Sequence, residues 1–542
     1  MNAETFSDLN PEQKKAVETI DGPILILAGA GSGKTRVITY RIAHLISKDV
    51  KPDSILAVTF TNKAAGEMKE RVEKLLGSPI GSMWIGTFHS ICVRILRREI
   101  QHIGYDRSFT IYNTSDQQDL IKECLRQLNY DDKLIKPRAL ASRISGIKNE
   151  FISPEEFASQ YANTFFDEKV AEVYTMYQNK LRSANALDFD DLIGKTIEIL
   201  QNFSEICAKY QRIFQYILVD EYQDTNRAQY LLVKLLVNDR SNICVVGDPD
   251  QSIYNFRGAD IRNILNFEKD YPKTKIFKLE ENYRSTQKIL LAAQKLIENN
   301  RQRKSKDLWT KNNEGEAIVI MGAMNEREEG MYVCQEIKKI INQLSNKANK
   351  QVSNISYNDF VVFYRTHAQS RALEESFLNS SIPYRIVGGT SFYERMEVKD
   401  ILAYLRIIQN GADFVSLARI ANKPARGIGD TAFSHLKKLT NLHDLNEDFL
   451  GPLDTRSKKA LTGFMNFYRR ICDIAREANV SELITTVAIM SGYKDMILDG
   501  TKEGEGRWEN IRELLSVAQR FDNLGPVESL TAFLQDIALI TN

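Results

Sequence analysis

The sequence predicts a mixed α/β protein of two lobes, each built on a parallel sheet and each carrying a mainly α-helical insertion. Short apolar runs that do not alternate with polar residues indicate strands buried on both faces. Longer stretches with helical periodicity divide these runs into two groups. At 542 residues, the chain is too long for one hydrophobic core, so several domains are expected.

Five apolar runs form the first group of predicted strands: residues 23–28, 55–60, 83–88, 216–221 and 243–248. A helical stretch, residues 111–189, lies between the third and the fourth run. Because the strand pattern resumes after this stretch, we interpret it as an insertion. We therefore assign residues 1–110 and 190–278 to the first lobe.

The second group of predicted strands comprises residues 275–280, 317–322, 359–365 and 383–389. We assign residues 279–390 to a second lobe and residues 391–542, where helical periodicity returns, to a second insertion. The first insertion leads back to its sheet, whereas the second does not, so we expect the second lobe to be incomplete. Truncation is one explanation. The alternative is a complete protein in which the helical region is the terminal domain.

The totals exclude several classes of protein. A net charge of +1 means that a polyanion would have to bind through local grooves and stacking rings. The six cysteines include no CxxC pair, so neither a disulfide framework nor a zinc or iron–sulfur site is predicted. No apolar run approaches the ~20 residues that cross a bilayer, and the start lacks the features of a signal peptide. We expect a cytoplasmic protein without a membrane partner.

The segment "AGAGSGKT" (28–35) follows a predicted strand and precedes a predicted helix. Its glycines let backbone N–H groups wrap phosphate oxygens at the helix N-terminus. Lys34 would reach the β- and γ-phosphates and Thr35 would hold Mg²⁺, so ATP and Mg²⁺ are the predicted cofactors. The strict pattern has Gly in place of Ala28. The alternative is a glycine-rich turn with a chance lysine. The remaining residues of this predicted site are Gly29, Ala30, Gly31, Ser32 and Gly33.

The segment "ILVDEYQD" (217–224) reads as a buried strand that ends in two carboxylates. Asp220 is the candidate Mg²⁺ ligand, and Glu221 is the candidate base that orients and deprotonates the attacking water. Since neighbouring side chains on a strand point to opposite faces, the strand has to end before Glu221. Without the phosphate loop, the pair would be more typical of a solvated loop.

The segment "LNPEQ" (9–13) is typical of a helix start. Asn10 is the candidate N-cap, Pro11 the first helical residue, and Gln13 the side chain that completes a capping box. On these residues alone, a purely structural role for Gln13 is the better interpretation.

The segment "VVGDPDQSIYNFRGAD" (245–260) begins as a strand and continues into a loop with two aromatic rings. Alternate positions within residues 253–257 make neither face of the loop cleanly apolar. We therefore expect Tyr254 and Phe256 to be exposed, although rings that face the core are the alternative.

These motifs resemble the UvrD/Rep/PcrA group of superfamily 1 DNA helicases. The resemblance covers nearly the whole chain and implies two RecA-like P-loop lobes. It also implies an ATP-dependent 3′→5′ helicase and single-stranded DNA translocase of DNA repair or replication. The matching segments are "LNPEQ", "AGAGSGKTRV", "ILAVTFTNKAAGEMKERV", "IGTFHS", "ALDFDDLI", "VDEYQDTN", "VVGDPDQSIYNFRGAD", "LEENYRST", "RTHAQSRALEE" and "IPYRIVGGTSFYERMEVKDILAYLR".

The resemblance also implies roles around the nucleotide. Gln13 would read the adenine edge, and Arg36 would lie against the nucleotide. Gln251 would sense the γ-phosphate. Tyr283 would stack on the adenine, and Arg284 would act as an arginine finger from the second lobe. A packed ring and a surface salt bridge are the alternative for the last two. The implied catalytic set is Lys34, Glu221, Gln251 and Arg284.

A second set of residues is implied to contact DNA. Bases stack on aromatic faces at roughly 1–3 kcal/mol each, without regard to sequence. A loop with a phosphate sensor at one end and rings at the other can convert nucleotide state into grip on the strand. Several relatives have Trp in place of Phe256, and the family usually has Asn in place of His367. The implied contacts are Phe60, Asn62, Thr87, Phe88, His89, Tyr254, Phe256 and Arg257.

Partners and rival functions follow from the same resemblance. Single-stranded DNA, its junction with duplex DNA and repair or replication proteins are the expected partners of a monomer or weakly self-associating protein. The basic run "RQRKSK" (301–306) is interpreted as a solvated loop, with direct DNA contact as the alternative. Relatives continue to a second γ-phosphate arginine that nothing here matches, so we expect impaired unwinding. The rivals are an ATP-gated DNA-binding subunit without motor activity and the motor half of a helicase–nuclease.

Overall fold

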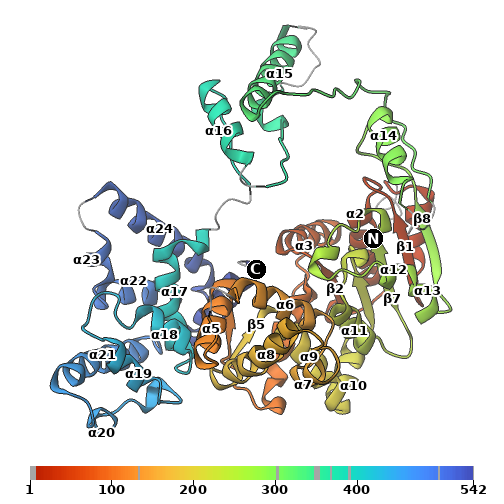
Figure 1. Cartoon of the computed structure of the whole chain (residues 1–542). Helices are drawn as coiled ribbons and strands as arrows, with labels where there is room; N and C mark the ends of the chain where they lie inside the picture. The colour runs from red at the N-terminus through yellow and green to blue at the C-terminus, as the bar shows by residue number, and fades with distance from the viewer. Residues whose placement is uncertain are drawn as a thin grey trace. The chain divides into compact units, whose positions relative to one another are not determined.

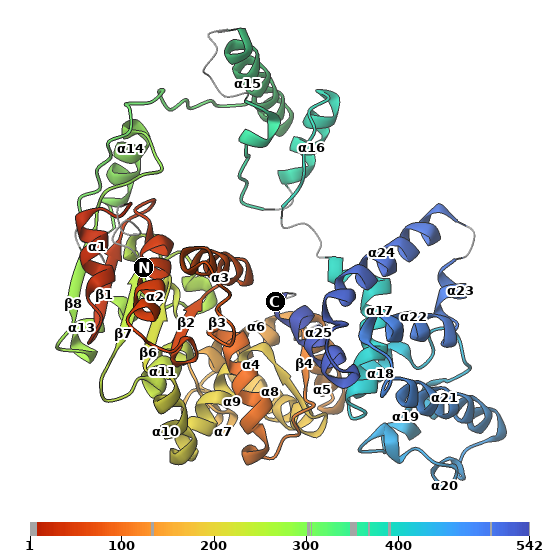
Figure 2. The ribbon, with the colours of Figure 1, turned by 180° about the vertical axis from the view of Figure 1, so that it is seen from behind.

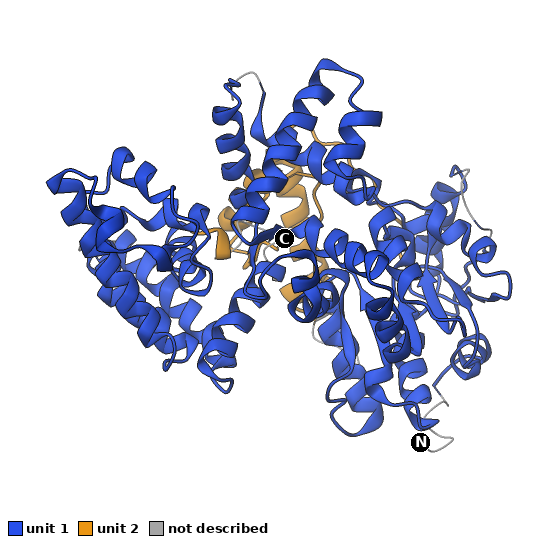
Figure 3. Ribbon diagram, turned by 90° about the horizontal axis from the view of Figure 1, so that it is seen from below, with its two compact units in different colours: residues 1–314, 396–542 blue, residues 315–395 orange. Residues whose placement is uncertain are grey.

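The computed structural model describes residues 8–131, 135–300, 304, 306–346, 355–366, 369–387, 392–498 and 501–540. The chain divides into two compact units (Figure 3). The larger unit comprises Met1–Glu314 and Met396–Asn542, and the smaller one comprises Gly315–Arg395.

The larger unit contains a six-stranded parallel sheet with the strand order β3-β2-β6-β7-β1-β8 (Figure 1). All five strands of the first predicted group are confirmed. The sixth strand was predicted to belong with the second group, but Ile24 of β1 pairs with Lys275 of β8. A local apolar pattern indicates a strand without indicating which sheet the strand joins. The strands are β1 (Ile24–Ala28), β2 (Ile55–Thr59), β3 (Trp84–Thr87), β6 (Tyr216–Val219), β7 (Ile243–Gly247) and β8 (Lys275–Leu279).

Alternating side chains of this sheet enter two hydrophobic cores, one on each face. Leu25 and Leu27 pack with α4, α9 and α11 on one face, whereas Ile24 and Ile26 pack with α1, α2 and α3 on the other (Figure 2). Burial on both faces explains why the strands read as continuous apolar runs. The helices are α1 (Pro11–Glu18), α2 (Lys34–Ser47), α3 (Asn62–Leu76), α4 (Phe88–Glu99), α9 (Phe189–Asn202), α10 (Ser204–Ile213), α11 (Arg227–Leu236), α12 (Arg262–Leu265), α13 (Phe267–Asp270) and α14 (Gln287–Ile297).

A helical subdomain with its own core lies between the short parallel strands β4 (Thr110–Tyr112) and β5 (Ala186–Asp188). A buried lysine ties it to the layer that covers the sheet. Lys148 Nζ lies 2.6 Å from Asp188 Oδ2 and 2.8 Å from Asp191 Oδ1. Burial alone would lower the pKa of Lys148, but the two carboxylates raise it above its usual value. The helices are α5 (Thr114–Gln127), α6 (Pro137–Asn149), α7 (Pro154–Gln160) and α8 (Phe165–Ser183).

The C-terminal part of the larger unit is helical, as predicted, and contacts the first subdomain through polar side chains. Tyr112 Oη donates to Asp413 Oδ1 at 2.8 Å, and Arg406 Nη1 donates to Asp116 Oδ2 at 2.6 Å. The helices are α17 (Met396–Gln409), α18 (Phe414–Ile420), α19 (Asp430–Leu436), α20 (Glu447–Leu450), α21 (Thr455–Ile474), α22 (Val480–Met490), α23 (Tyr493–Ile497), α24 (Lys502–Ala518) and α25 (Pro526–Ile540).

The smaller unit pairs α15 (Glu326–Asn346) with α16 (Ser370–Asn379), and its described residues form no strand. The strands predicted at 317–322 and 359–365 are therefore wrong. The strand predicted at 383–389 is also wrong over its described part, residues 383–387. Ile320 is 95% exposed and Phe363 is 89% exposed. An apolar run becomes a strand only when its backbone groups pair with a neighbour, and no described residue supplies that pairing here. Residues 388–389 and His367 lie outside the described residues.

The six cysteines are free thiols. Of the described helices, none combines the length and the apolar character that crossing a bilayer requires.

The buried Lys148 cluster predicts the effect of removing its cation. Lys148→Met leaves two carboxylates buried without their partner, so we expect the free energy of unfolding to fall by about 3–5 kcal/mol. Urea unfolding would measure it. The control is Lys122→Met, because Lys122 pairs with Asp119 on an exposed helix surface and should change stability by less than about 1 kcal/mol. Equal effects of the two substitutions would contradict the prediction.

Candidate nucleotide site and nucleic-acid interface

The parallel strands of the large sheet all end at one edge, and the candidate residues follow those ends. In open α/β sheets, ligands bind outside the carboxyl ends of the strands. Four loops carry residues expected to contact the nucleotide, and they follow β1, β6, β7 and β8. Two further loops, which follow β2 and β3, carry residues expected to contact DNA.

The phosphate loop turns from β1 into α2 over five residues. Gly31 and Gly33 have φ values of +67° and +86°, a region that L side chains adopt only under strain. A Cβ atom at Gly31 would also lie 2.8 Å from the Arg284 Cβ atom. Ser32 Oγ donates to Gly29 O at 2.7 Å and tightens the loop. Because α2 begins at Lys34, its free N–H groups and dipole suit phosphate oxygens.

Glu221 faces the phosphate loop because the strand ends before it. β6 stops at Val219, as expected, and Glu221 itself has a φ of +50°. A non-glycine residue in this left-handed region costs of order 1 kcal/mol, and such strain is typical of functional sites. Glu221 Oε2 lies 2.5 Å from Lys34 Nζ. The structure thus brings together the expected base and the expected phosphate-binding lysine.

The carboxylates after β6 form a site with the donors that Mg²⁺ prefers. Burial and the neighbouring Glu221 raise the pKa of Asp220 to about 7, and the same two causes raise the pKa of Asp224 to about 6. Crowded buried carboxylates favour a cation. The Asp220 carboxylate and the Thr35 hydroxyl, which are the expected Mg²⁺ ligands, are hard oxygen donors of the kind that binds Mg²⁺ beside substrate phosphates. Among the described residues, no group of three or more His, Cys, Asp or Glu could hold a metal by itself.

Gln13 completes the predicted capping box and also contacts the phosphate loop. Its Oε1 accepts from Asn10 N at 3.1 Å, and its backbone N donates to Asn10 Oδ1 at 2.8 Å. Its Nε2 donates to Ser32 O at 2.9 Å. The helix-start interpretation is therefore confirmed, and the buried side chain also supports the phosphate loop. Reading of the adenine edge by Gln13 stays a prediction.

The segment after β8 is hydrogen-bonded to the phosphate loop. Asn282 Nδ2 donates to Ala30 O at 2.6 Å, and Tyr283 N donates to Gly31 O at 3.0 Å. Tyr283 Oη donates to Glu281 Oε2 at 2.7 Å, while the residue is nearly half exposed. The ring is not packed in a core, and Arg284 forms no salt bridge with a described residue. Both side chains are available to a nucleotide.

Two polar residues connect Gln251 with Glu221, and neither was predicted from the sequence. Asp248 Oδ2 accepts from Gln251 Nε2 at 2.5 Å, and Asp248 N donates to Gln223 Oε1 at 2.9 Å. Gln223 Nε2 in turn donates to Glu221 Oε2 at 2.9 Å. Asp248 is the last residue of the predicted strand 243–248 and Gln223 lies two residues after the predicted strand 216–221. This position at the end of a strand is the signal that could have indicated them.

The aromatic loop after Gln251 projects its rings into solvent. Tyr254 is 40% exposed and Phe256 is 72% exposed, and their ring centroids are 6.0 Å apart. The Arg257 guanidinium lies 5.8 Å from each ring centroid. The core-facing alternative is therefore wrong. Exposed rings beside an arginine have the composition of a surface on which bases stack.

The expected DNA contacts at the end of β3 and directly after it, Thr87, Phe88 and His89, each contact protein neighbours. The Phe88 ring lies in the core beneath the sheet and contacts Phe60 edge to face at 5.9 Å. The predicted direct contact between this ring and a base is therefore wrong, because protein covers the ring. Thr87 Oγ1 accepts from Ser90 N at 3.2 Å and caps α4. His89 stacks on Phe189 with the ring centroids 3.7 Å apart.

Asn62, which was expected to contact DNA, and Arg36, which was expected to lie against the nucleotide, each contact a described neighbour. Asn62 begins α3, and its Nδ2 donates to Leu539 O of α25 at 3.2 Å. Arg36 lies near the phosphate loop in the first turn of α2, where its guanidinium is 3.4 Å from Asp8 Oδ2. Asn62 is exposed and Arg36 is partly exposed.

The basic run at 301–306 is only partly a solvated loop. Lys306 is 5% exposed and forms ion pairs with Asp248 and Asp250, so the solvated interpretation is wrong for this residue. Its partners lie more than fifty positions away in the sequence, and no local pattern indicates them. Residues 301–303 and 305 lie outside the described residues.

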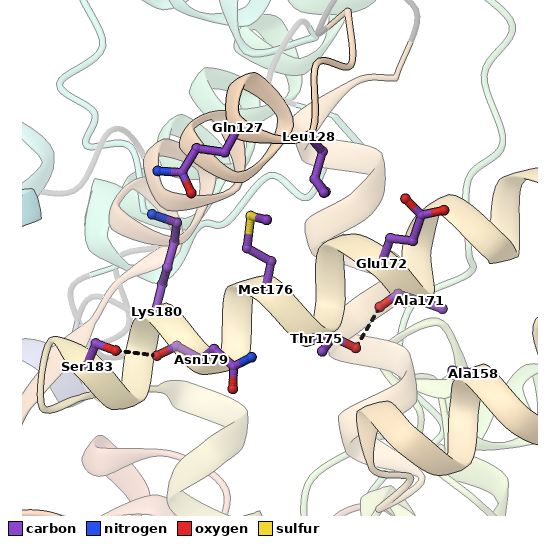
Figure 4. Close-up of a pocket in the computed structure, with 10 residues that line it drawn as sticks. All are labelled: Gln127, Leu128, Ala158, Ala171, Glu172, Thr175, Met176, Asn179, Lys180 and Ser183. Carbon is purple, nitrogen blue, oxygen red and sulfur yellow. Dashed lines mark hydrogen bonds between the residues drawn. The ribbon is translucent and has the colours of Figure 1, made fainter.

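A separate groove of about 620 Å³ lies on the helical subdomain between β4 and β5 (Figure 4). Two of its polar side chains form hydrogen bonds within α8: Thr175 Oγ1 donates to Ala171 O and Ser183 Oγ donates to Asn179 O. None of the candidate site residues lines it, and we assign it no chemistry. The lining residues are Gln127, Leu128, Ala158, Ala171, Glu172, Thr175, Met176, Asn179, Lys180 and Ser183.

Comparisons with known proteins agree with this arrangement of loops. The family model "UvrD/REP helicase N-terminal domain" matches residues 9–272, and "UvrD-like helicase C-terminal domain" matches residues 277–542. The chain is 47% identical over 546 residues to the ATP-dependent DNA helicase PcrA of Bacillus subtilis (strain 168), covering 99% of this chain and 72% of that protein. It is 48% identical over 552 residues to the ATP-dependent DNA helicase PcrA of Staphylococcus aureus (strain Mu50), covering 100% and 74%.

His89 provides a pH-dependent prediction. Burial lowers the pKa of His89 to about 3, whereas an unfolded histidine titrates near 6.5. As the pH falls below 6.5, only the unfolded state takes up the proton, so the free energy of unfolding decreases. Between pH 7.5 and 5.0, the free energy of unfolding of the unmodified protein should therefore fall by an amount of order 1 kcal/mol because of His89. The variant His89→Phe should not show this decrease.

Urea unfolding at the two pH values would measure this loss. His443→Phe, at an exposed histidine, controls for the exchange itself. Identical pH dependence of His89→Phe and the unmodified protein would show that His89 takes up its proton equally in both states.

Proposed function

Because the chain belongs to the UvrD/Rep family of superfamily 1 helicases, we propose that it is an ATP-dependent DNA helicase that translocates 3′→5′ along single-stranded DNA. One observation carries the proposal. Lys34, Glu221, Gln251 and Arg284 lie on or directly after the loops that follow β1, β6, β7 and β8, and hydrogen bonds connect those loops.

The site has the parts that phosphoryl transfer to water requires. Backbone N–H groups of the phosphate loop bind the phosphates, and Lys34 contacts the β- and γ-phosphates. Thr35 and Asp220 would hold Mg²⁺, which neutralises developing charge on the phosphate oxygens. A γ-phosphate that draws Lys34 away from Glu221 frees this carboxylate to accept a proton from the attacking water. Arg284 stabilises the transferring group.

The aromatic loop is the proposed link between nucleotide and DNA. Gln251 ends the short helical turn Pro249–Gln251, and the turn Asn255–Arg257 follows within the same loop. A displacement of Gln251 by the γ-phosphate therefore moves Tyr254 and Phe256, on which bases stack. Alternating strong and weak grip on the strand, timed by hydrolysis, produces directional movement.

We also propose the domain arrangement of the family for this chain. Residues 1–110 with 190–278 form a RecA-like lobe with the insertion 111–189, and residues 279–390 belong to a second lobe with the insertion 391–542. The insertions meet the junction of single-stranded and duplex DNA or repair and replication proteins.

A second candidate function is an ATP-gated DNA-binding subunit without motor activity. The observation that favours it is the smaller unit, whose described residues form no sheet against which the larger unit could work. Stimulation of ATP hydrolysis by single-stranded DNA distinguishes the two, because a motor is stimulated and a gated binder is not.

Substitution of the proposed base tests the chemistry. Glu221→Gln keeps the shape of the side chain and removes its basicity, so we expect kcat for ATP hydrolysis to fall by about 10²–10⁴ while ATP still binds. Phosphate release with single-stranded DNA present measures kcat, and a fluorescent ATP analogue measures binding. The control is Glu70→Gln on the exposed side of α3. Hydrolysis at the unmodified rate by Glu221→Gln would refute the assignment.

Substitution of the more exposed of the two rings of the aromatic loop tests the DNA interface. Phe256→Ala removes one stacking surface, so single-stranded DNA should bind more weakly by roughly 1–3 kcal/mol, or about 5- to 150-fold. Fluorescence anisotropy of a labelled oligothymidylate measures the Kd. Ile253→Ala is the matched control, because Ile253 is an equally exposed side chain of the same loop without a ring. Comparable weakening by both would indicate loss of loop structure instead of loss of stacking.

A further inference from the structure

Lys306 is a buried cation between two loops of the nucleotide site. It is 5% exposed, although lysine is almost never fully buried unless it is paired. Its Nζ forms an ion pair with Asp248 Oδ1 and a second one, at 2.9 Å, with Asp250 Oδ2. The side chains of all three residues are less than a tenth exposed. The function proposed above assigns Lys306 no part.

The carboxylate that Lys306 contacts is the one that holds Gln251. Asp248 Oδ1 accepts from Lys306 Nζ and, at 3.0 Å, from Asp250 N. Its Oδ2 accepts from Gln251 Nε2 at 2.5 Å. Lys306 on one oxygen therefore orients the carboxylate whose other oxygen orients the Gln251 amide. Rotation of the Asp248 carboxylate would misplace Gln251.

The same short segment is also attached to the loop that carries Arg284. Asn282 N donates to Trp309 O at 2.7 Å, and Trp309 N donates to Glu280 O at 3.0 Å. Between these points, the Leu308 side chain packs directly against the phosphate loop, where a Cβ atom on Gly29 would meet it at 2.1 Å. Residues 306–309 thus contact the Gln251 turn at one end and the Arg284 loop at the other.

We propose that Lys306 is a positioning residue for ATP hydrolysis, which holds Gln251 in place through Asp248 and couples the Gln251 turn to the loop of Arg284. This inference rests on the proposed function. A buried ion pair is expensive to desolvate and is weak evidence for stability in itself. It does impose a defined geometry, and a misplacement of about 1 Å in a catalytic group can cost about 100-fold in rate.

The test uses Lys306→Met, which keeps the length of the side chain and removes its charge. We expect kcat for DNA-stimulated ATP hydrolysis to fall about 10- to 100-fold, while KM for ATP changes less than about threefold. Because Lys306 acts through Gln251, the double variant with Gln251→Ala should be no slower than Gln251→Ala alone. A purely structural role would instead multiply the two effects. Lys304→Met is the matched control, since Lys304 pairs with Glu268 outside the site.

A second measurement keeps the test independent of catalysis. Amide hydrogen exchange of the turn at residues 248–252 should accelerate at least about tenfold in Lys306→Met and stay unchanged in Lys304→Met. If Lys306→Met unfolds, the variant Lys306→Met/Asp250→Asn, which removes one buried anion together with the cation, takes its place in both measurements.

The outcomes separate the two proposals. Unchanged exchange of the turn, or kcat within about twofold of the unmodified protein, overturns the role of Lys306. Absence of DNA-stimulated hydrolysis in the unmodified protein overturns the proposed function, and the exchange measurement then still decides whether Lys306 holds the turn. Multiplicative loss in the double variant shows that Lys306 supports the fold alone.

Discussion

Parallel pairing of six strands is the constraint on which the nucleotide site depends. Since every strand runs in the same direction, every strand ends at the same edge, and residues as far apart in the sequence as Ala30 and Asn282 meet there. Neither the phosphate loop nor the Asp220–Glu221 pair is specific by itself. Their convergence turns a glycine-rich turn and a pair of carboxylates into a site for phosphoryl chemistry.

Hydrogen bonds connect the loops at this edge of the sheet with one another. Glu221, Gln223, Asp248 and Gln251 form one chain of direct contacts, and Lys34 joins it through Glu221. A buried polar chain is costly if any member loses its partner. In the proposed mechanism, a phosphate that displaces Lys34 or Gln251 therefore also displaces the neighbouring members of this chain. The exposed rings of Tyr254 and Phe256 lie next along the same loop, where the proposed mechanism places the bases of the bound strand.

The sequence predicted the parts of this arrangement that depend on local pattern. Continuous apolar runs indicated the strands, "LNPEQ" indicated the start of α1, and the mixed faces of residues 253–257 indicated exposed rings. Features that depend on distant partners were missed. The run at 317–322 is as apolar as β1, yet it forms no strand because no described residue pairs with it. Phe88 follows a strand as a ligand-binding residue would, but the core beneath β3 covers its ring. The site-forming contacts of Lys306 could not be inferred from a basic run.

Two lysines illustrate how a nearly neutral chain uses buried charge. Lys148 lies between Asp188 and Asp191, and Lys306 lies between Asp248 and Asp250. In each case one ammonium group bridges two carboxylates that would repel each other without it. A hydrophobic substitute would fill the same volume but would not require any one orientation of its neighbours. The first cluster joins a helical subdomain to the layer over the sheet, and the second joins two loops of the nucleotide site. Both clusters join two parts of the fold whose relative position has to be fixed. An ion pair fixes that position because it requires one orientation of its partners, whereas a packed methylene group does not.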